Sequence, residues 1–124
     1  MLQITPQMRI LLSIKPADFR KGIDGLAGIC RNELHEDPFT GTVFIFRNRA
    51  RTALKILVYD GQGMWLCNKR LSEGRFKWWP QDITREGKIQ SLLAYELQVL
   101  LWNGDPTASN IQEQWREIKT TIEA

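Results

Sequence analysis

Histidine and cysteine are scarce in this 124-residue chain, which has one histidine and two cysteines. Cys30 and Cys67 stand far apart and form no Cys-x-x-Cys pair. A structural zinc site needs about four clustered nitrogen or sulfur ligands, so the sequence predicts no metal centre of this kind. We expect both thiols to be small buried groups in a protein of a reducing compartment.

Long apolar runs are also missing. The run from Ile10 to Ile14 is too short for the core of a secretion signal, and no small-residue cleavage site follows it. No segment approaches the roughly 18 apolar residues of a membrane-spanning helix. These features predict a cytoplasmic protein with no membrane partner. The length and the ordinary globular composition predict one domain, residues 1–124.

Acidic residues are few in the middle of the chain. Residues 44–79 carry eight lysines and arginines but only two acidic residues, a local charge of +6 in a chain of net charge +3. Such an excess repels itself unless a polyanion lies nearby, and arginine suits phosphate oxygens. We therefore predict a nucleic-acid-binding surface. Its candidate residues are Arg47, Arg49, Arg51, Lys55, Lys69, Arg70, Arg75 and Lys77, with Arg20 and Lys21 as outer candidates.

The spacing of apolar residues predicts an α+β fold. We expect an antiparallel β meander of about four to five strands, packed with one N-terminal helix and two C-terminal helices. The N-terminal helix is predicted from about residue 17 to 34, and the C-terminal helices occupy a segment of about residues 84–124. The predicted strands cover residues 9–14, 42–47, 53–59, 64–69 and 75–79.

Two glycine patterns carry further expectations. The turn Asp60-Gly61-Gln62-Gly63 predicts a hairpin with a two-residue loop. Gly22, Gly25 and Gly28 lower helix propensity, so we expect close packing of the first helix against a neighbour. The hairpin fixes a register in which Tyr59 faces Met64, Leu57 faces Leu66, and Lys55 faces Asn68.

Trp78 and Trp79 are adjacent on a predicted strand and should point to opposite faces. We therefore expect one of them to be buried and the other exposed. The exposed ring would stack on a base or dock a protein partner.

Carboxylates offer a weaker, catalytic alternative. Asp18, Asp24 and Asp60 would have to assemble into a metal site for phosphoryl transfer. Asp18 is better explained as an anion at a helix start and Asp60 as a turn former. No catalytic motif is present, so the sequence predicts no catalytic residues, no metal and no cofactor.

Several stretches together resemble one protein family. Residues 18–26 read DFRKGIDGL, residues 37–41 DPFTG and residues 43–49 VFIFRNR. They are followed by KILVYDGQG at residues 55–63, KRL at residues 69–71, GRFKW at residues 74–78 and LLWNG at residues 100–104. In this order the motifs resemble the TnpB, or Orf2-like, accessory proteins of the IS66 family of bacterial insertion sequences.

The resemblance implies a role in DNA recombination, namely the transposition of a mobile element beside a separate transposase. The implied partners are DNA at the insertion-sequence ends, the transposase and other element-encoded proteins, and homo-oligomers are left open. The resemblance supplies no catalytic residues. Two alternatives stay open: an adaptor that docks the transposase through its C-terminal helices without binding DNA, and a metal-dependent enzyme acting on nucleic acid.

Overall fold

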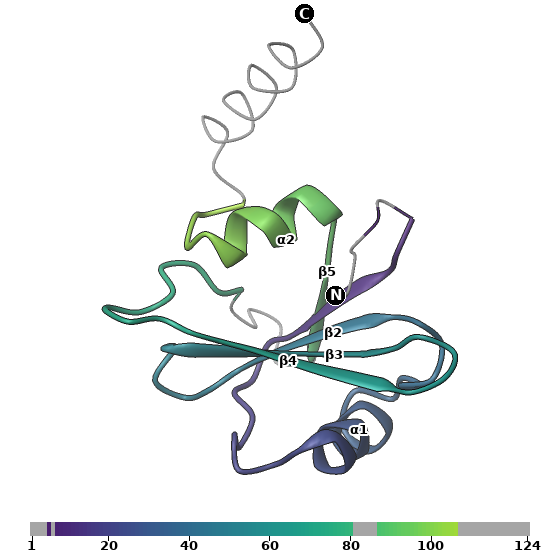
Figure 1. The fold of residues 1–124 in the computed structure, drawn as a ribbon. Helices are drawn as coiled ribbons and strands as arrows, with labels where there is room; N and C mark the ends of the chain where they lie inside the picture. Colours follow the sequence, from purple (N-terminus) through teal and green to yellow (C-terminus); the bar gives the residue numbers. More distant parts are fainter. Residues whose placement is uncertain (1–4, 6, 81–86, 107–124) are drawn as a thin grey trace, which may run out of the picture.

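The computed structural model describes residue 5, residues 7–80 and residues 87–106. This part of the chain forms one five-stranded sheet and two helices (Figure 1). In chain order the elements are β1 (Ile10–Ser13), α1 (Ile23–Asn32), β2 (Val43–Arg47), β3 (Ala53–Tyr59), β4 (Met64–Arg70), β5 (Ile89–Leu92) and α2 (Ala94–Leu101).

The sheet has the strand order β4-β3-β2-β1-β5. β2, β3 and β4 form the predicted antiparallel meander, and β5 is antiparallel to β1. β1, however, pairs with β2 in parallel, so the fully antiparallel sheet that we predicted is wrong at this point. Neighbouring parallel strands need a crossover connection, and the segment containing α1 provides it.

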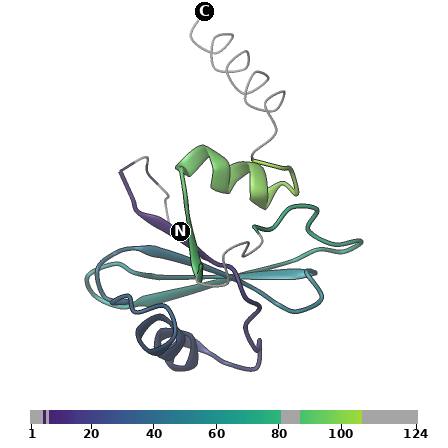
Figure 2. The same cartoon turned by 180° about the vertical axis from the view of Figure 1, so that it is seen from behind.

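The two helices cover opposite faces of the sheet (Figures 1 and 2). Alternate strand residues divide accordingly between two apolar clusters. On the α1 face, Phe44 and Phe46 pack with Leu26 and Cys30 of the helix. On the α2 face the cluster contains Ile10, Leu12, Val43, Ile45, Leu54, Val58, Phe76, Trp79, Leu92, Leu97 and Leu100.

The β3–β4 hairpin confirms the predicted register. Tyr59 pairs with Met64, and the backbone N–H of Asp60 donates to the Gly63 carbonyl at 3.0 Å. Gly61 has φ +97°, which glycine adopts without strain. Hydrogen bonds from the Gly63 and Gln62 amides, and from the indole of Trp65, lower the pKa of Asp60. The remaining predicted pairs, Leu57 with Leu66 and Lys55 with Asn68, are also present.

The region after β4 differs from the prediction. Residues 75–79 form no strand, although the Phe76 N–H donates to the Arg51 carbonyl at 2.8 Å. Residues 89–92, predicted as helix, form β5 against the edge of β1, and α2 covers only eight residues. Its first turn is fixed by the Glu96 carboxylate, which accepts a hydrogen bond from the Leu93 N–H at 2.8 Å. The second predicted C-terminal helix lies outside the described residues.

The first helix also begins later than predicted. α1 starts at Ile23 with Gly22 as its N-cap, so Asp18 lies ahead of the helix. The predicted close packing at the glycines is wrong. A Cβ at Gly22 or Gly28 would meet no atom within 4 Å, and at Gly25 it would meet only the side chain of Lys21.

Buried positions settle two further expectations. Trp79 is buried and Trp78 is half-buried against the same cluster, so neither is the exposed ring that we predicted.

Cys30 is buried as expected, and burial raises the pKa of its thiol to about 12. Cys67 is only half-buried. Within residues 7–80 and 87–106, neither helix has the length and apolar character required to cross a bilayer.

Candidate nucleic-acid interface

Three connections meet at one end of the sheet. β2 ends at Arg47, β3 begins at Ala53, and Arg70 at the end of β4 pairs with Ala53. The Leu71 N–H donates to the Thr52 carbonyl at 2.9 Å, which joins the chain after β4 to the β2–β3 loop. The segment after β1 lies at the same end of the sheet, because the Ala17 N–H donates to the Arg47 carbonyl at 2.9 Å.

The β2–β3 loop is ordered by the side chain of Asn48. Its Oδ1 accepts hydrogen bonds from the N–H groups of Thr52 and Ala53 at 2.9 and 3.2 Å. Its Nδ2 donates to the Thr52 hydroxyl at 2.8 Å. Arg51 adopts φ +60°, a left-handed conformation that is costly for a residue with a Cβ. The fixed loop presents Arg49 to solvent.

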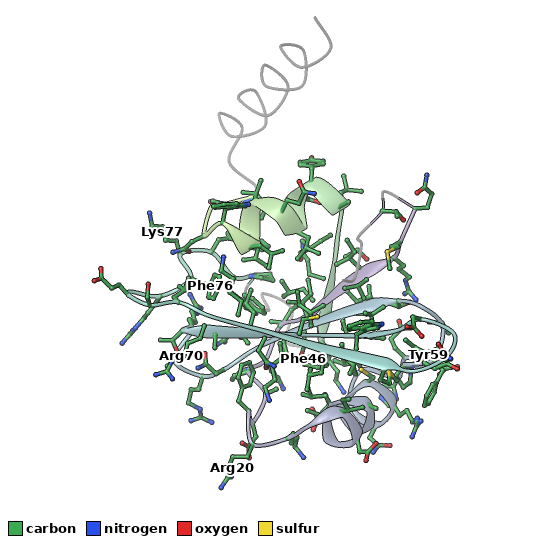
Figure 3. All side chains as sticks on the ribbon, in the orientation of Figure 1. Arg20, Phe46, Tyr59, Arg70, Phe76 and Lys77 are labelled. Carbon is green, nitrogen blue, oxygen red and sulfur yellow. The ribbon has the colours of Figure 1, made fainter. Side chains whose placement is uncertain are left out.

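We call this region the basic end. Figure 3 shows Arg70 and Lys77 on the side of the molecule away from Tyr59, with Arg20 below them. Among the described residues, six of the predicted site residues have no ion pair and no side-chain hydrogen bond. Arg51 is half-buried, and the other five are exposed. These six are Lys21, Arg49, Arg51, Arg70, Arg75 and Lys77.

Three other predicted site residues instead contact the protein. Lys55 on β3 donates from Nζ to the carbonyls of Phe19 and Lys21 at 2.9 and 3.1 Å, and its Nζ lies 5.1 Å from the centre of the Phe19 ring. Lys69 on β4 donates to the Leu101 carbonyl at the end of α2. The ammonium of Lys55 therefore bonds the segment before α1 to the sheet. The ammonium of Lys69 bonds the end of α2 to the sheet.

Arg47 is the third such residue. Its guanidinium carbon lies 5.7 Å from the centre of the Trp79 ring, and one terminal nitrogen donates to the carbonyls of Asn48 and Arg49. The Nε atom is buried without a hydrogen-bond partner among the described residues. Burial, followed by the charge of Arg51, lowers the pKa of Arg47. It contributes positive potential to the basic end while its side chain is held in place.

Arg20 is exposed but already neutralised. It forms an ion pair with Asp18 at 2.8 Å, and its backbone N–H also donates to that carboxylate. These side-chain and backbone hydrogen bonds lower the pKa of Asp18 to about 2. Arg20 is thus a weaker candidate for phosphate binding than Arg70.

Replacing Arg20 by alanine is expected to raise the Asp18 pKa from about 2 toward its ordinary value of 3.8. The depressed pKa means that the ion pair favours folding above the unfolded-state pKa and loses that contribution as the pH falls through the folded value. Carboxyl NMR titration measures the change. Asp60, whose hydrogen bonds lie in the β3–β4 hairpin, should keep its titration curve. An unchanged Asp18 curve would contradict the pairing.

The cations surround the end of the sheet and do not lie together on one of its faces. Arg70 projects on the α1 side with Lys55, whereas Lys69 projects on the α2 side next to Trp102. The reason is that helices cover both faces of the sheet (Figure 2). The basic surface is therefore formed by loops and strand ends.

Lys15 and Lys88 were missed by sequence reasoning. They are exposed where β1 ends and β5 begins, and the Ile14 N–H donates to the Lys88 carbonyl at 3.0 Å. Because β1 runs parallel to β2, its end lies on the same side as Arg47. A correct assignment of that parallel pair would have placed Lys15 there.

The structure does not bring together the carboxylates of the catalytic alternative. Asp18 lies near the basic end, while Asp60 lies in the hairpin at the opposite end of β3. Within residues 7–80 and 87–106, no group of three or more histidine, cysteine or acidic side chains is arranged to hold a metal ion.

These features define a small α+β protein whose loops gather arginines and lysines at one end of a mixed sheet. A family model described as IS66 Orf2 like protein matches residues 8–109, and the chain belongs to this family. It is therefore an insertion-sequence protein associated with transposition.

Two relatives come from Sinorhizobium fredii (strain NBRC 101917 / NGR234). Uncharacterized protein y4jC is 38% identical over 69 residues, which cover 56% of this chain and 59% of y4jC. Uncharacterized protein y4hO is 32% identical over 119 residues, which cover 96% of this chain and 98% of y4hO. No solved structure matches the chain.

Proposed function

We propose that this protein is a non-catalytic accessory factor in transposition that binds DNA of its insertion sequence, or the transposase–DNA complex, through the basic end. The observation that carries the proposal is the convergence of six cations without ion pairs at the meeting point of three connections. Like charges brought this close repel one another, and a phosphate backbone relieves the repulsion. Binding would also release condensed counterions from the DNA.

The same surface suits phosphates better than base edges. Its cations project from loops and strand ends around a sheet end, and none of them lies on α1 or α2, the helices of the described residues, so none is placed on a helix that would enter a major groove. Contacts of this kind position a protein on DNA without reading its sequence. We therefore expect affinity for duplex DNA that depends strongly on salt and weakly on base sequence.

Replacing Arg49 and Arg70 together by alanine should weaken binding of duplex DNA by about one to two orders of magnitude near 0.1 M salt. The plot of log affinity against log salt concentration should become shallower by about 1.8, since each lost phosphate contact removes about 0.9. Fluorescence anisotropy at several salt concentrations measures both quantities. Neither side chain has a hydrogen bond among the described residues, so stability should change little.

Arg9→Ala with Arg31→Ala is the matched control, because it removes the same charge elsewhere. Arg9 pairs with Glu36 at 3.0 Å, and Arg31 lies 5.1 Å from the centre of the Phe39 ring. Phe39 in turn contacts Tyr59, at the end of β3 away from the basic end. Equal losses in the two double variants would mean that only net charge matters, and the basic end would then have no special role.

An adaptor function is the second candidate. It is favoured by α2 and its flanks, where Leu93 is 59% exposed and Trp102 is 86% exposed. Co-purification with the transposase from nuclease-treated lysate, together with no DNA affinity of the isolated protein, would support the adaptor and exclude our proposal.

The non-catalytic part of the proposal has its own test. DNA cleavage that requires Mg²⁺ or Mn²⁺, and that is abolished by Asp18→Ala or Asp24→Ala, would show that the protein is an enzyme.

A further inference from the structure

Trp102 is the most exposed large apolar side chain in the described part of the protein, at 86% of its full accessibility. A second exposed tryptophan, Trp65, is 42% exposed and donates its indole N–H to Asp60 at 2.7 Å. Tryptophan is largely buried in most folded proteins, and its large flat ring is a frequent binding group. Neither helix packing nor a hydrogen bond explains why Trp102 lies in solvent.

The backbone that carries Trp102 is fixed to the basic end. Trp102 is the C-cap of α2, and Asn103 follows it with φ +62°, a conformation that asparagine tolerates at helix ends. The Asn103 side chain accepts a hydrogen bond from the Lys77 N–H at 2.7 Å and donates to the Arg75 carbonyl at 3.1 Å. These bonds join the end of α2 to the loop that carries two of the exposed cations.

One lysine lies next to the ring, and two further cations lie on the loop that is bonded to the end of α2. The Nζ atom of Lys69 lies 5.7 Å from the centre of the Trp102 ring and also donates to the neighbouring Leu101 carbonyl. Arg75 and Lys77 are exposed on the attached loop. In Figure 1 the C-terminal end of α2 and the loop after β4 lie on the same side of the molecule. An exposed ring among cations complements a polyanion that also offers flat apolar surfaces.

We propose that Trp102 is a stacking platform for an unpaired base and that, with Arg75 and Lys77, it forms a binding site for single-stranded DNA. The inference rests on the proposed function and specifies single-stranded DNA as the ligand of this part of the surface. Bases within a duplex stack on each other and offer no free face, so Trp102 adds affinity only where a strand is unpaired. Cationic grooves with aromatic rings bind single strands in this manner, with little dependence on sequence.

The test compares a labelled oligothymidylate with a duplex of equal length for the wild type and for Trp102→Ala, Trp102→Phe and Trp65→Ala. Trp102→Ala should weaken single-strand binding by about 5-fold to 150-fold, the range for one stacked base, and change duplex binding less than about twofold. Trp102→Phe should retain most of the affinity, because phenylalanine still stacks. Trp65→Ala, which removes the exposed ring of the hairpin, should change neither.

Two outcomes would overturn the inference: no effect of Trp102→Ala on the single strand, or equal losses for both probes. Loss of transposase binding with unchanged oligonucleotide affinity would instead assign the ring to a protein contact. A failure of the proposed function gives a different result. In that case, replacing Arg49 and Arg70 together by alanine would weaken duplex binding no more than the Arg9 and Arg31 control does. Thermal unfolding should confirm that all variants fold, as expected for a ring so exposed. An oligouridylate probe separates DNA from RNA binding.

Discussion

Trp79→Ala is expected to lower the free energy of unfolding by about 3–5 kcal/mol, as for other large buried aromatic residues. The Trp79 side chain is only 5% exposed and packs in the cluster between the sheet and α2. Its indole N–H donates to the carbonyls of Ser13 and Ile14 at 3.2 and 3.0 Å. Because domains of this size are stable by only about 5–15 kcal/mol, a large part of the molecules should unfold on mild heating.

Trp79→Phe separates packing from hydrogen bonding. Phenylalanine keeps most of the buried ring but leaves the carbonyls at the end of β1 without this donor, a cost of about 1–3 kcal/mol. Urea unfolding followed by circular dichroism measures each variant without depending on tryptophan emission.

The control for this prediction is Trp102→Ala, which should leave the midpoint almost unchanged since the ring is 86% exposed. If Trp79→Ala unfolds within about 1 kcal/mol of the wild type, Trp79 does not hold the segment after β4 against the sheet. Trp79→Ala should therefore lower stability, whereas Trp102→Ala should leave stability unchanged and weaken the binding of single-stranded DNA.

Local signals in the sequence were sufficient for the central meander. The Asp60–Gly63 turn fixes the hairpin because its residues hydrogen-bond to one another, and the register from Tyr59 with Met64 to Lys55 with Asn68 follows from the alternation of the strands. α1 was located by its apolar periodicity, although its start was placed too early. In both cases residues close in the chain determine the structure.

Long-range pairing was not visible in the sequence. The parallel contact of β1 with β2 joins residues such as Leu11 and Phe44, and no turn connects them directly. β5 was mistaken for helix because Ile89 and Leu92 are three residues apart, which also fits a helical face. Its conformation is decided by the exposed edge of β1, to which residues 89–92 add a strand.

The candidate site shows the same division. Composition identified the excess of positive charge, and the fold gathers most of those side chains at one sheet end. Composition could not distinguish Arg70, which is exposed, from Lys55, whose partners are carbonyls 34 and 36 residues away in the chain. It also directed attention to Trp78 and Trp79, whereas the exposed ring near the cations is Trp102.

Lys55→Met provides the sharpest separation of structural cations from binding cations. Methionine keeps an unbranched apolar chain but removes the ammonium that bonds the Phe19 and Lys21 carbonyls. Since hydrogen bonds to charged groups contribute about 1.5–3 kcal/mol each and this site is partly exposed, we expect a loss of about 2–3 kcal/mol in the free energy of unfolding. Denaturant titration measures it. The salt dependence of duplex binding, measured where the variant is still folded, should stay at the wild-type slope.

Arg70→Ala should behave in the opposite way. Arg70 lies on the same sheet face as Lys55, at the end of the neighbouring strand, yet its side chain is exposed and has no partner among the described residues. Its removal should leave the denaturant midpoint within about 0.5 kcal/mol of the wild type and reduce the salt slope by about 0.9. A slope for Lys55→Met that is shallower than the wild-type slope, as for Arg70→Ala, would place the ammonium of Lys55 on the DNA. The contacts with the Phe19 and Lys21 carbonyls would then not persist in the complex.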